Sequence, residues 1–193
     1  MNPHMRQDNT GMRQIVKLAE GLPVAEMHRA LLAQPELWDQ NPGRTENTDS
    51  PHFGLSDIWV RFAPPGSGAT VSHRSVWYPS ASVLPVGPLV YPLISLCEGE
   101  ELGGILITKI PAGRRCLPHR DTQWHASFYE KFAIQIESDP GQSFCFHGES
   151  LVTAPGDLYW FNNAHEHWVE NPTRSDRITM IVCIRTTVMD ELK

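Results

Sequence analysis

Two short segments of this 193-residue chain carry side chains that could bind one metal ion. In Leu-Pro-His119-Arg-Asp121 an imidazole and a carboxylate are two residues apart. In Asn-Ala-His165-Glu-His167 two further imidazoles share one face of an expected strand, so spacing alone does not choose between them. Two imidazoles and one carboxylate form a facial triad, a ligand set typical of non-haem Fe(II), which leaves three positions open for other ligands.

Arg177 lies ten residues after His167 and begins the apolar segment 177–184. Both alternating faces of this segment are largely apolar, which predicts a central strand covered on both sides. Arg177 shares its face with Thr179, Ile181 and Cys183. A guanidinium on such a face must find an anion, because unpaired buried donors are costly. The distal carboxylate of 2-oxoglutarate is a bidentate partner that would satisfy it.

The elements that must position these residues are read from apolar spacing. From Gln14 to about Trp38 apolar residues recur at roughly helical intervals, interrupted near Gly21, which predicts one or two N-terminal helices. The polar stretch 41–54 is rich in turn formers and is expected to be an exposed connection. The region 63–100 is rich in proline and forms either an irregular flap or an insertion that contains a helix, and propensity alone does not decide between them.

Beyond the connection, short apolar segments alternate with Pro, Gly, Asn and Asp, as in GGILITKI, KFAIQI, DLYWFN and RITMIVCIR. This pattern predicts a mainly β fold, a double-stranded β-helix of the jelly-roll, cupin-like type, with the N-terminal helices packed on one sheet. We expect a single domain over residues 1–193, with a helical part and loop in 1–50 and the β-helix core in 51–193.

The segment from Gly104 to Ile184 resembles the aspartyl/asparaginyl β-hydroxylase family of Fe(II)- and 2-oxoglutarate-dependent oxygenases. The likeness rests on ILITKIPAGRRCLPHRD and on PGDLYWFNNAHEHWVENPTRSDRITMIV. The family has a proximal His in an IPPG…PHxD segment, a distal His followed by x-V-x-N, and an Arg opening the next strand. His119, His167 and Arg177 take these positions, and the resemblance therefore selects His167 over His165.

The resemblance implies further roles. Asp121 completes the triad with His119 and His167. Thr108 stands where the family has a hydroxyl residue near the cosubstrate, and Lys131 stands where an Arg often assists carboxylate binding. Ala133 departs from the family, which frequently has His there. The implied activity is a dioxygenase, a hydroxylase that uses Fe(II), 2-oxoglutarate and dioxygen on an amino acid, a peptide, or an Asp or Asn side chain of a protein.

Other aromatic and histidine residues have two interpretations each. Trp124, His125 and Phe128 could line the substrate entrance, or they could pack against the rim of the barrel. His147 and His165 are expected at the surface or next to the metal ligands. The expected core includes Trp59, Trp77 and Tyr78.

Composition limits the alternatives. A formal net charge of -6 gives no broad attraction to nucleic acid or anionic lipid. The N-terminus lacks the uninterrupted apolar stretch of a secretory signal, and no apolar run reaches the roughly 18 residues of a membrane span, so we expect a cytoplasmic protein. Four widely spaced cysteines form no CxxC pair and are expected to be free, buried thiols.

Two other functions compete with the oxygenase hypothesis. A cupin-like module could bind a metal or a small ligand in the same barrel without 2-oxoglutarate, but it would have no use for Arg177. An oxygenase of the same chemistry could modify nucleic acid, although the acidic balance of the chain weighs against this.

Overall fold

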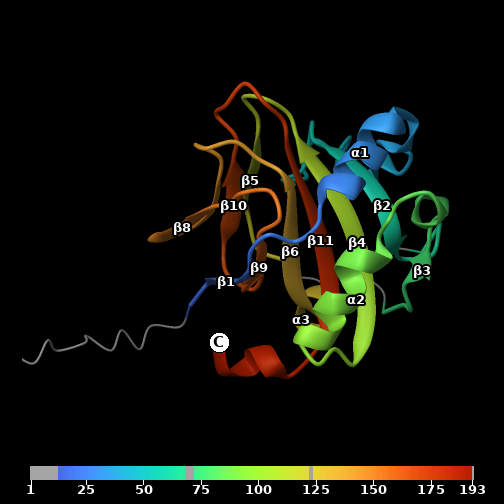
Figure 1. Ribbon diagram of the computed structural model, residues 1–193, viewed down its shortest axis with the longest axis vertical. Helices are drawn as coiled ribbons and strands as arrows, with labels where there is room; N and C mark the ends of the chain where they lie inside the picture. Colours follow the sequence, from blue (N-terminus) through green and yellow to red (C-terminus); the bar gives the residue numbers. More distant parts are fainter. Residues whose placement is uncertain (1–12, 68–71, 122–123, 193) are drawn as a thin grey trace, which may run out of the picture.

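A computed structural model describes residues 13–67, 72–121 and 124–192 (Figure 1). Most of its regular structure is β, and the helices are short. The elements, in chain order, are β1 (Ile15–Ala19), α1 (Ala25–Ala33), η1 (Pro35–Leu37), η2 (Pro42–Arg44), β2 (Ser56–Phe62), β3 (Val76–Trp77), η3 (Pro79–Ser82), α2 (Gly87–Leu96), β4 (Glu101–Ile110), β5 (Arg115–His119), α3 (Trp124–Phe128), β6 (Glu130–Glu137), β7 (Ser143–Phe146), β8 (Glu149–Val152), β9 (Leu158–Phe161), β10 (His167–Glu170), β11 (Arg177–Arg185) and η4 (Val188–Leu192).

Two antiparallel sheets face each other. The larger sheet has the strand order β1-β9-β6-β11-β4-β2-β3, and the smaller has the order β5-β10-β7-β8. Strands that follow one another along the chain from β4 to β11 alternate largely between the sheets, as they do in a jelly roll. The predicted double-stranded β-helix is therefore confirmed.

The central strand of the larger sheet is β11, which pairs with β4 on one side and β6 on the other. Side chains alternate between the faces of a strand, so β11 contributes to two interiors. One face packs into the main hydrophobic core, through Ile178, Met180, Val182 and Ile184. The opposite face lines a pocket between the sheets, through Thr179, Ile181 and Cys183. The expectation of a strand covered on both sides is confirmed.

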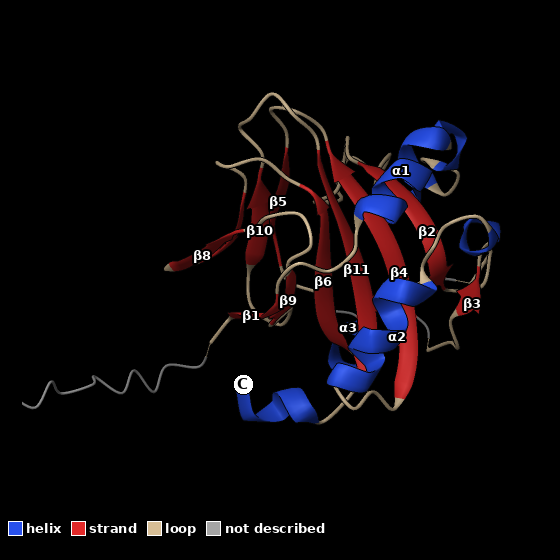
Figure 2. Ribbon diagram, in the orientation of Figure 1, coloured by secondary structure: helices blue, strands red, loops and turns tan. Residues whose placement is uncertain are grey.

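Helices α1 and α2 lie on the outer face of the larger sheet, away from the smaller one (Figure 2). Met27 and Leu31 of α1 and Leu89, Val90 and Leu93 of α2 are buried in the main core. Burying large aliphatic side chains contributes about 1.5–3 kcal/mol each. The helices thus stabilise the sheet from behind and leave its inner face free to build the pocket.

The first part of the expected N-terminal helical region is wrong. Residues Ile15–Ala19 form an edge strand that pairs antiparallel with β9, and the helix begins only at Ala25. Ile15 and Val16 are β-branched, which favours a strand where a partner edge is available. Gly21, with φ at 72°, separates the two elements.

The expectation that residues 41–54 form an exposed connection is wrong in part. The segment contains η2, and its Arg44, Ser50 and His52 line the pocket between the sheets. Trp77 also differs from its expected place in the core, since it is 49% exposed. Its ring packs under the guanidinium of Arg61, 5.0 Å from the ring centroid. Trp59 was also expected in the core, but it is only partly buried and lines the pocket, whereas Tyr78 is buried, as predicted.

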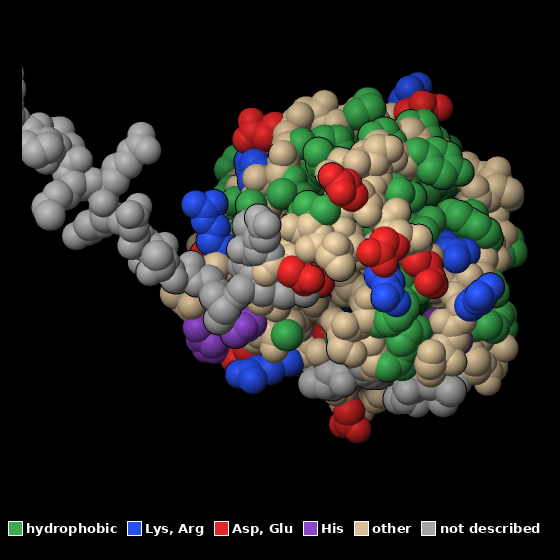
Figure 3. All heavy atoms as spheres, turned by 90° about the horizontal axis from the view of Figure 1, so that it is seen from below, with side chains coloured by type: hydrophobic (Ala, Val, Ile, Leu, Met, Phe, Trp, Pro, Cys, Tyr) green, Lys and Arg blue, Asp and Glu red, His purple; other side chains and the backbone are tan. Residues whose placement is uncertain are grey.

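All four cysteines are free and buried, as predicted. No helix within the described residues is both long and apolar enough to cross a membrane. On the face drawn in Figure 3, described Lys and Arg side chains are spread among Asp and Glu and do not gather into one area. Among the described residues drawn there, no continuous basic track of the kind that binds a nucleic-acid backbone is visible.

Candidate metal centre

The candidate metal ligands meet where two neighbouring strands of the smaller sheet pair. His119 at the end of β5 is the register partner of His167 at the start of β10, and their ring centroids are 4.4 Å apart. Asp121 follows β5 directly. One ligand atom from each of the three lies within 4.8 Å of the others. His119 Nε2 and Asp121 Oδ1 are 3.9 Å apart, within the roughly 4.2 Å that two ligands of one ion can span.

Both imidazoles are held in the same tautomer by the backbone. His119 Nδ1 lies 2.7 Å from the carbonyl oxygen of Leu117, and His167 Nδ1 lies 2.9 Å from that of His165. A carbonyl can only accept, so Nδ1 must carry the proton and donate in each ring. Nε2 is left with its lone pair free, which is the form that binds a metal ion.

Electrostatics also favour neutral imidazoles. Burial lowers the pKa of His119, and burial together with the neighbouring His119 lowers the pKa of His167 to about 4. At neutral pH neither ring needs to lose a proton before it can ligate a metal ion.

Lys131 on β6 donates from Nζ to Oδ2 of Asp121. Burial raises the pKa of Asp121, but the charge and hydrogen bond of Lys131 outweigh this effect, and the pKa falls to about 2. The carboxylate is therefore ionised and available to a cation. The sequence resemblance assigns Lys131 to the cosubstrate, which stays a prediction. In the structure it contacts the candidate metal carboxylate.

A second set of possible ligands shares His119 and adds His52 and Cys116. Thiolate is the form of cysteine that binds metals. Burial raises the pKa of the Cys116 thiol to about 12, so this side chain is a neutral thiol at physiological pH. The set with Asp121 and His167 is the better metal site because all of its groups already have the protonation state that ligation requires.

Arg177 at the start of β11 is almost fully buried, at 1% exposure. It donates from Nη1 to Thr153 Oγ1 at 2.9 Å and from Nη2 to the Tyr159 hydroxyl at 3.3 Å. Among the described residues its Nε has no partner, and the titratable groups that act on the guanidinium are Tyr159 and Cys145 rather than a carboxylate. Tyr159 and Thr179, beside it, line the pocket. A buried cation behind this wall fits a ligand carboxylate entering from the metal side.

Thr108 belongs to a polar network that the sequence did not reveal. Its hydroxyl donates to Asp57 Oδ1 at 2.8 Å and accepts from Arg44 Nη2 at 2.7 Å. Arg44 also donates from Nε and Nη2 to both oxygens of Asp57. The one signal was Asp57 itself, since a carboxylate in the apolar strand DIWVRF needs a cation partner. A cosubstrate contact for Thr108 stays a prediction.

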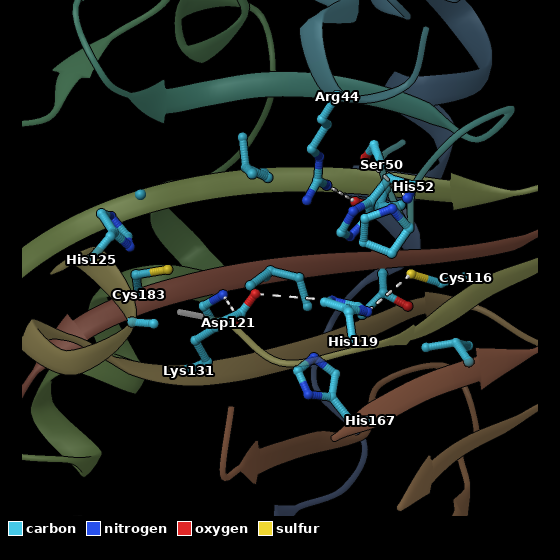
Figure 4. A pocket seen from close by; sticks show the side chains of 18 of the residues that line it. Arg44, Ser50, His52, Cys116, His119, Asp121, His125, Lys131, His167 and Cys183 are labelled. Atoms are coloured by element: carbon cyan, nitrogen blue, oxygen red, sulfur yellow. Dashed lines mark hydrogen bonds and ion pairs between the residues drawn. The ribbon is translucent and has the colours of Figure 1, made fainter. Parts of the chain in front are cut away.

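The pocket that joins these groups has a volume of about 580 Å³. Figure 4 shows the candidate ligands and Lys131 on one wall, with Arg44 and His52 facing them from the loop before β2. Near the candidate ligands the wall includes Phe144, Phe161 and Ile181. Apolar walls of this kind exclude water and strengthen the electrostatic interactions inside.

The three residues expected either at the substrate entrance or against the rim of the barrel differ in position. His125 is buried and lines the pocket, while Trp124 packs against its ring at 5.3 Å. Phe128 is 36% exposed and carries the Arg185 guanidinium over its ring. His147 and His165 are exposed, and His147 bonds Glu166, so the prediction of surface positions is confirmed.

Comparisons with known proteins give structural neighbours only. No protein-family model matches the sequence, and no curated protein matches it. A Trichoplax adhaerens prolyl hydroxylase in complex with a hypoxia inducible factor peptide is 12% identical, with 93% of this chain and 87% of that chain covered and a TM-score of 0.57. A Pseudomonas putida prolyl-4-hydroxylase is 14% identical, with 90% and 92% covered and a TM-score of 0.55.

A third neighbour is a 2OG-Fe(II) oxygenase family protein from Burkholderia pseudomallei. It is 13% identical, with 68% of this chain and 67% of that chain covered and a TM-score of 0.52. The chain has the fold of the 2-oxoglutarate oxygenases. At these identities the likeness establishes the fold, and function must be argued from the site. The closer relationship to aspartyl/asparaginyl β-hydroxylases stays a prediction.

Proposed function

We propose that the chain is an Fe(II)- and 2-oxoglutarate-dependent dioxygenase that hydroxylates a C–H bond of an amino acid, a peptide, or an Asp or Asn side chain of a protein. The observation that carries the proposal is the meeting of His119, Asp121 and His167 at one end of a pocket with a buried, carboxylate-free Arg177 behind its wall. A metal-binding module accounts for the first feature but gives no reason for the second.

The donor set fits Fe(II). His119 and His167 would offer Nε2, and Asp121 would offer an ionised carboxylate oxygen, which together make the two-histidine, one-carboxylate triad. When bound, Fe(II) and 2-oxoglutarate supply the oxidising chemistry, in which dioxygen is consumed, 2-oxoglutarate becomes succinate and carbon dioxide, and one oxygen atom enters the substrate C–H bond.

The side chains of the protein bind the cosubstrate, keep Asp121 ionised and exclude water. Arg177 would pair with the distal carboxylate of 2-oxoglutarate, and the Tyr159 hydroxyl beside it would help to orient that group. Lys131 holds Asp121 ionised before a metal ion arrives. Phe144, Phe161 and Ile181 would keep water away from the reacting groups.

The test is anaerobic titration of the metal-free protein with Fe(II) and 2-oxoglutarate, followed by the weak visible charge-transfer band of the ternary complex. Wild type should develop the band, and His167→Ala should not. Arg177→Met should need a much higher 2-oxoglutarate concentration to develop the band, because the guanidinium is lost. Most of the side-chain volume is kept, so the surrounding packing should change little. His165→Ala is the matched control for His167, since its exposed side chain lies two residues away, and it should behave as wild type.

Two outcomes contradict the proposal. Metal binding without any band at saturating 2-oxoglutarate favours the cupin-like binding module. An unchanged 2-oxoglutarate titration in Arg177→Met removes the cosubstrate role of that residue.

A further inference from the structure

One end of the pocket is walled by aromatic rings and an imidazole. Trp59 and Phe62 reach it from β2, and His125 reaches it from α3. We call these three residues the aromatic subsite. Figure 4 shows His125 next to Cys183, some way along the pocket from the candidate metal ligands. The aromatic subsite opens into the same pocket as Asp121 and Lys131, so a ligand held there can reach the metal centre.

Polar atoms without hydrogen-bond partners are concentrated in this region. Trp59 Nε1 and His125 Nε2 are closed off from solvent and have no hydrogen-bond partner among the described residues, and both residues line the pocket. Behind them, Trp124 Nε1 and both ring nitrogens of His73 are in the same condition. Each unsatisfied buried group costs about 1–3 kcal/mol. The protein thus keeps hydrogen-bonding capacity at this end of the pocket that its own described residues do not use.

Glycine makes room for the subsite. A Cβ atom at Gly104 on β4 would lie 2.9 Å from Phe62 Cδ2 and 3.5 Å from His125 Cε1. The two rings therefore lie directly against the strand, and a larger residue at position 104 would push the Phe62 ring away. This close approach sets the depth of the subsite.

The subsite is electrically neutral. The ring of His125 contacts Phe62, Tyr129 and Trp124, and burial lowers its pKa to about 3, so it is uncharged at neutral pH. The nearby Arg61 is turned away, donating to the carbonyl oxygen of Leu102. The charge of Lys131 also acts on His125, but that ammonium group is already paired with Asp121. A carboxylate entering here would therefore lose its hydration without gaining an unpaired counter-charge, which is strongly unfavourable. An indole N–H can only donate, so the ligand must carry an acceptor.

We propose that the aromatic subsite binds a neutral, planar amide of the substrate, either a peptide bond or a side-chain carboxamide, in preference to a carboxylate. On binding, the Trp59 ring turns its covered N–H into the pocket and donates to the amide carbonyl, the imidazole of His125 turns to meet the other polar edge, and Phe62 packs on the amide plane. The inference rests on the proposed function only where it calls this amide part of the substrate.

The test uses the indole N–H signals of the isotope-labelled full-length chain in two-dimensional NMR. No metal is added, so a carboxylate cannot coordinate a metal ion in the pocket. The probes are propanamide, its isosteric carboxylate propionate, and N-acetylglycine methylamide. The Trp59 signal, assigned with Trp59→Phe, should shift saturably with propanamide, with the capped peptide or with both, and not with propionate. The amide that produces the shift identifies the side chain or the backbone as its source.

The chain contains a matched control. Trp160 Nε1 already donates to Glu130 Oε2 at 2.9 Å, so its signal should stay in place with every probe. His125→Phe keeps a ring but removes both nitrogens, and it should weaken the response of Trp59 to the amide by fivefold or more. Trp77→Phe, outside the pocket, should leave the response unchanged.

Three results overturn the amide proposal. These are an equal shift with propionate, an unaltered amide response in His125→Phe, and no shift of Trp59 with either amide while the Trp160 signal shows a folded protein. Each is independent of the Fe(II) and 2-oxoglutarate titration, because neither is present. A protein that forms the charge-transfer band yet ignores amides would refute the subsite and leave the oxygenase proposal intact.

Discussion

The two oxygens of Asp121 face two different partners. Oδ2 accepts the hydrogen bond of Lys131 Nζ, whereas Oδ1 lies 3.9 Å from His119 Nε2 on the side of the candidate metal ligands. One carboxylate therefore stands between a fixed ammonium group and the place where a metal cation would sit. The ammonium group keeps the carboxylate ionised, but it also repels the incoming cation and competes for the same charge.

Replacing Lys131 by Met should consequently strengthen metal binding. We expect the dissociation constant for Mn(II), measured by calorimetry at pH 8, to fall about tenfold, which corresponds to ~1.4 kcal/mol. The affinity for 2-oxoglutarate in the metal-loaded protein should change little if Lys131 serves Asp121 alone. A loss of 2-oxoglutarate affinity greater than tenfold would instead support the cosubstrate contact that the sequence resemblance implies.

The choice between the two possible ligand sets can be tested by comparing single substitutions. Asp121→Ala and His167→Ala should each weaken metal binding by on the order of 100-fold or more, because a ligand of the ion is lost. Cys116→Ser keeps nearly the same volume and should leave the affinity within about threefold. Metal binding that survives Asp121→Ala and fails in Cys116→Ser would assign the ion to the set containing His52.

The ion pair between the half-buried Arg44 and the buried Asp57 should be important for stability. In Arg44→Met the carboxylate of Asp57, on a residue that is 1% exposed, is left without its cation. Removing one partner of a buried pair costs about 3–5 kcal/mol. Urea unfolding should show this loss, and Arg44→Met combined with Asp57→Leu should recover most of it. Failure of the double variant to recover would mean that Arg44 holds the loop through other contacts.

Acid should destabilise the protein through its buried histidines. Burial lowers the pKa of His125 to about 3, and burial with the nearby His119 lowers that of His167 to about 4, from 6.5. Below pH 6.5 the two histidines take up protons in the unfolded chain but not in the folded chain. Their contribution to the free energy of unfolding is therefore fully present near pH 7 and is lost as the pH drops toward 4. Each histidine contributes up to about 1.4 kcal/mol per pH unit in this window.

Urea unfolding of the metal-free protein at pH 7, 6 and 5 measures this dependence. His125→Phe should reduce the slope by about one proton, whereas His165→Ala, with an exposed side chain, serves as the control. An unchanged slope in His125→Phe would show that its ring takes up a proton in the folded state.

Most strand segments of the β-helix could be predicted because their signal is local, whereas the order of the strands within each sheet was not predicted. Segments such as 177–184 alternate two apolar faces and are bounded by turn residues, and β11 runs over nearly this range. The strand Ile15–Ala19 was missed because five residues cannot distinguish helical from strand spacing, and its partner β9 lies more than 130 residues away in the chain.

Some residues of the site could likewise be predicted from the sequence, and others could not. His119, Asp121, His167 and Arg177 stand in recognisable order at the ends of three strands, β5, β10 and β11. Arg44 and His52 sit in a polar loop with no periodicity, and only the folded sheet brings them to the pocket. The aromatic subsite combines β2 with α3, whose separation in sequence hides its composition.

Leu117 and His165 each present a backbone carbonyl to the histidine two positions later. Every amino acid supplies such a carbonyl, so exchange of either side chain leaves the acceptor in place. Substitutions elsewhere in the pocket therefore leave the acceptors that orient the two imidazoles in place. Substitutions in the Arg44 loop or in the aromatic subsite can change which molecule binds in the pocket. They do not change the tautomer in which both histidines keep the Nε2 lone pair free for a metal ion.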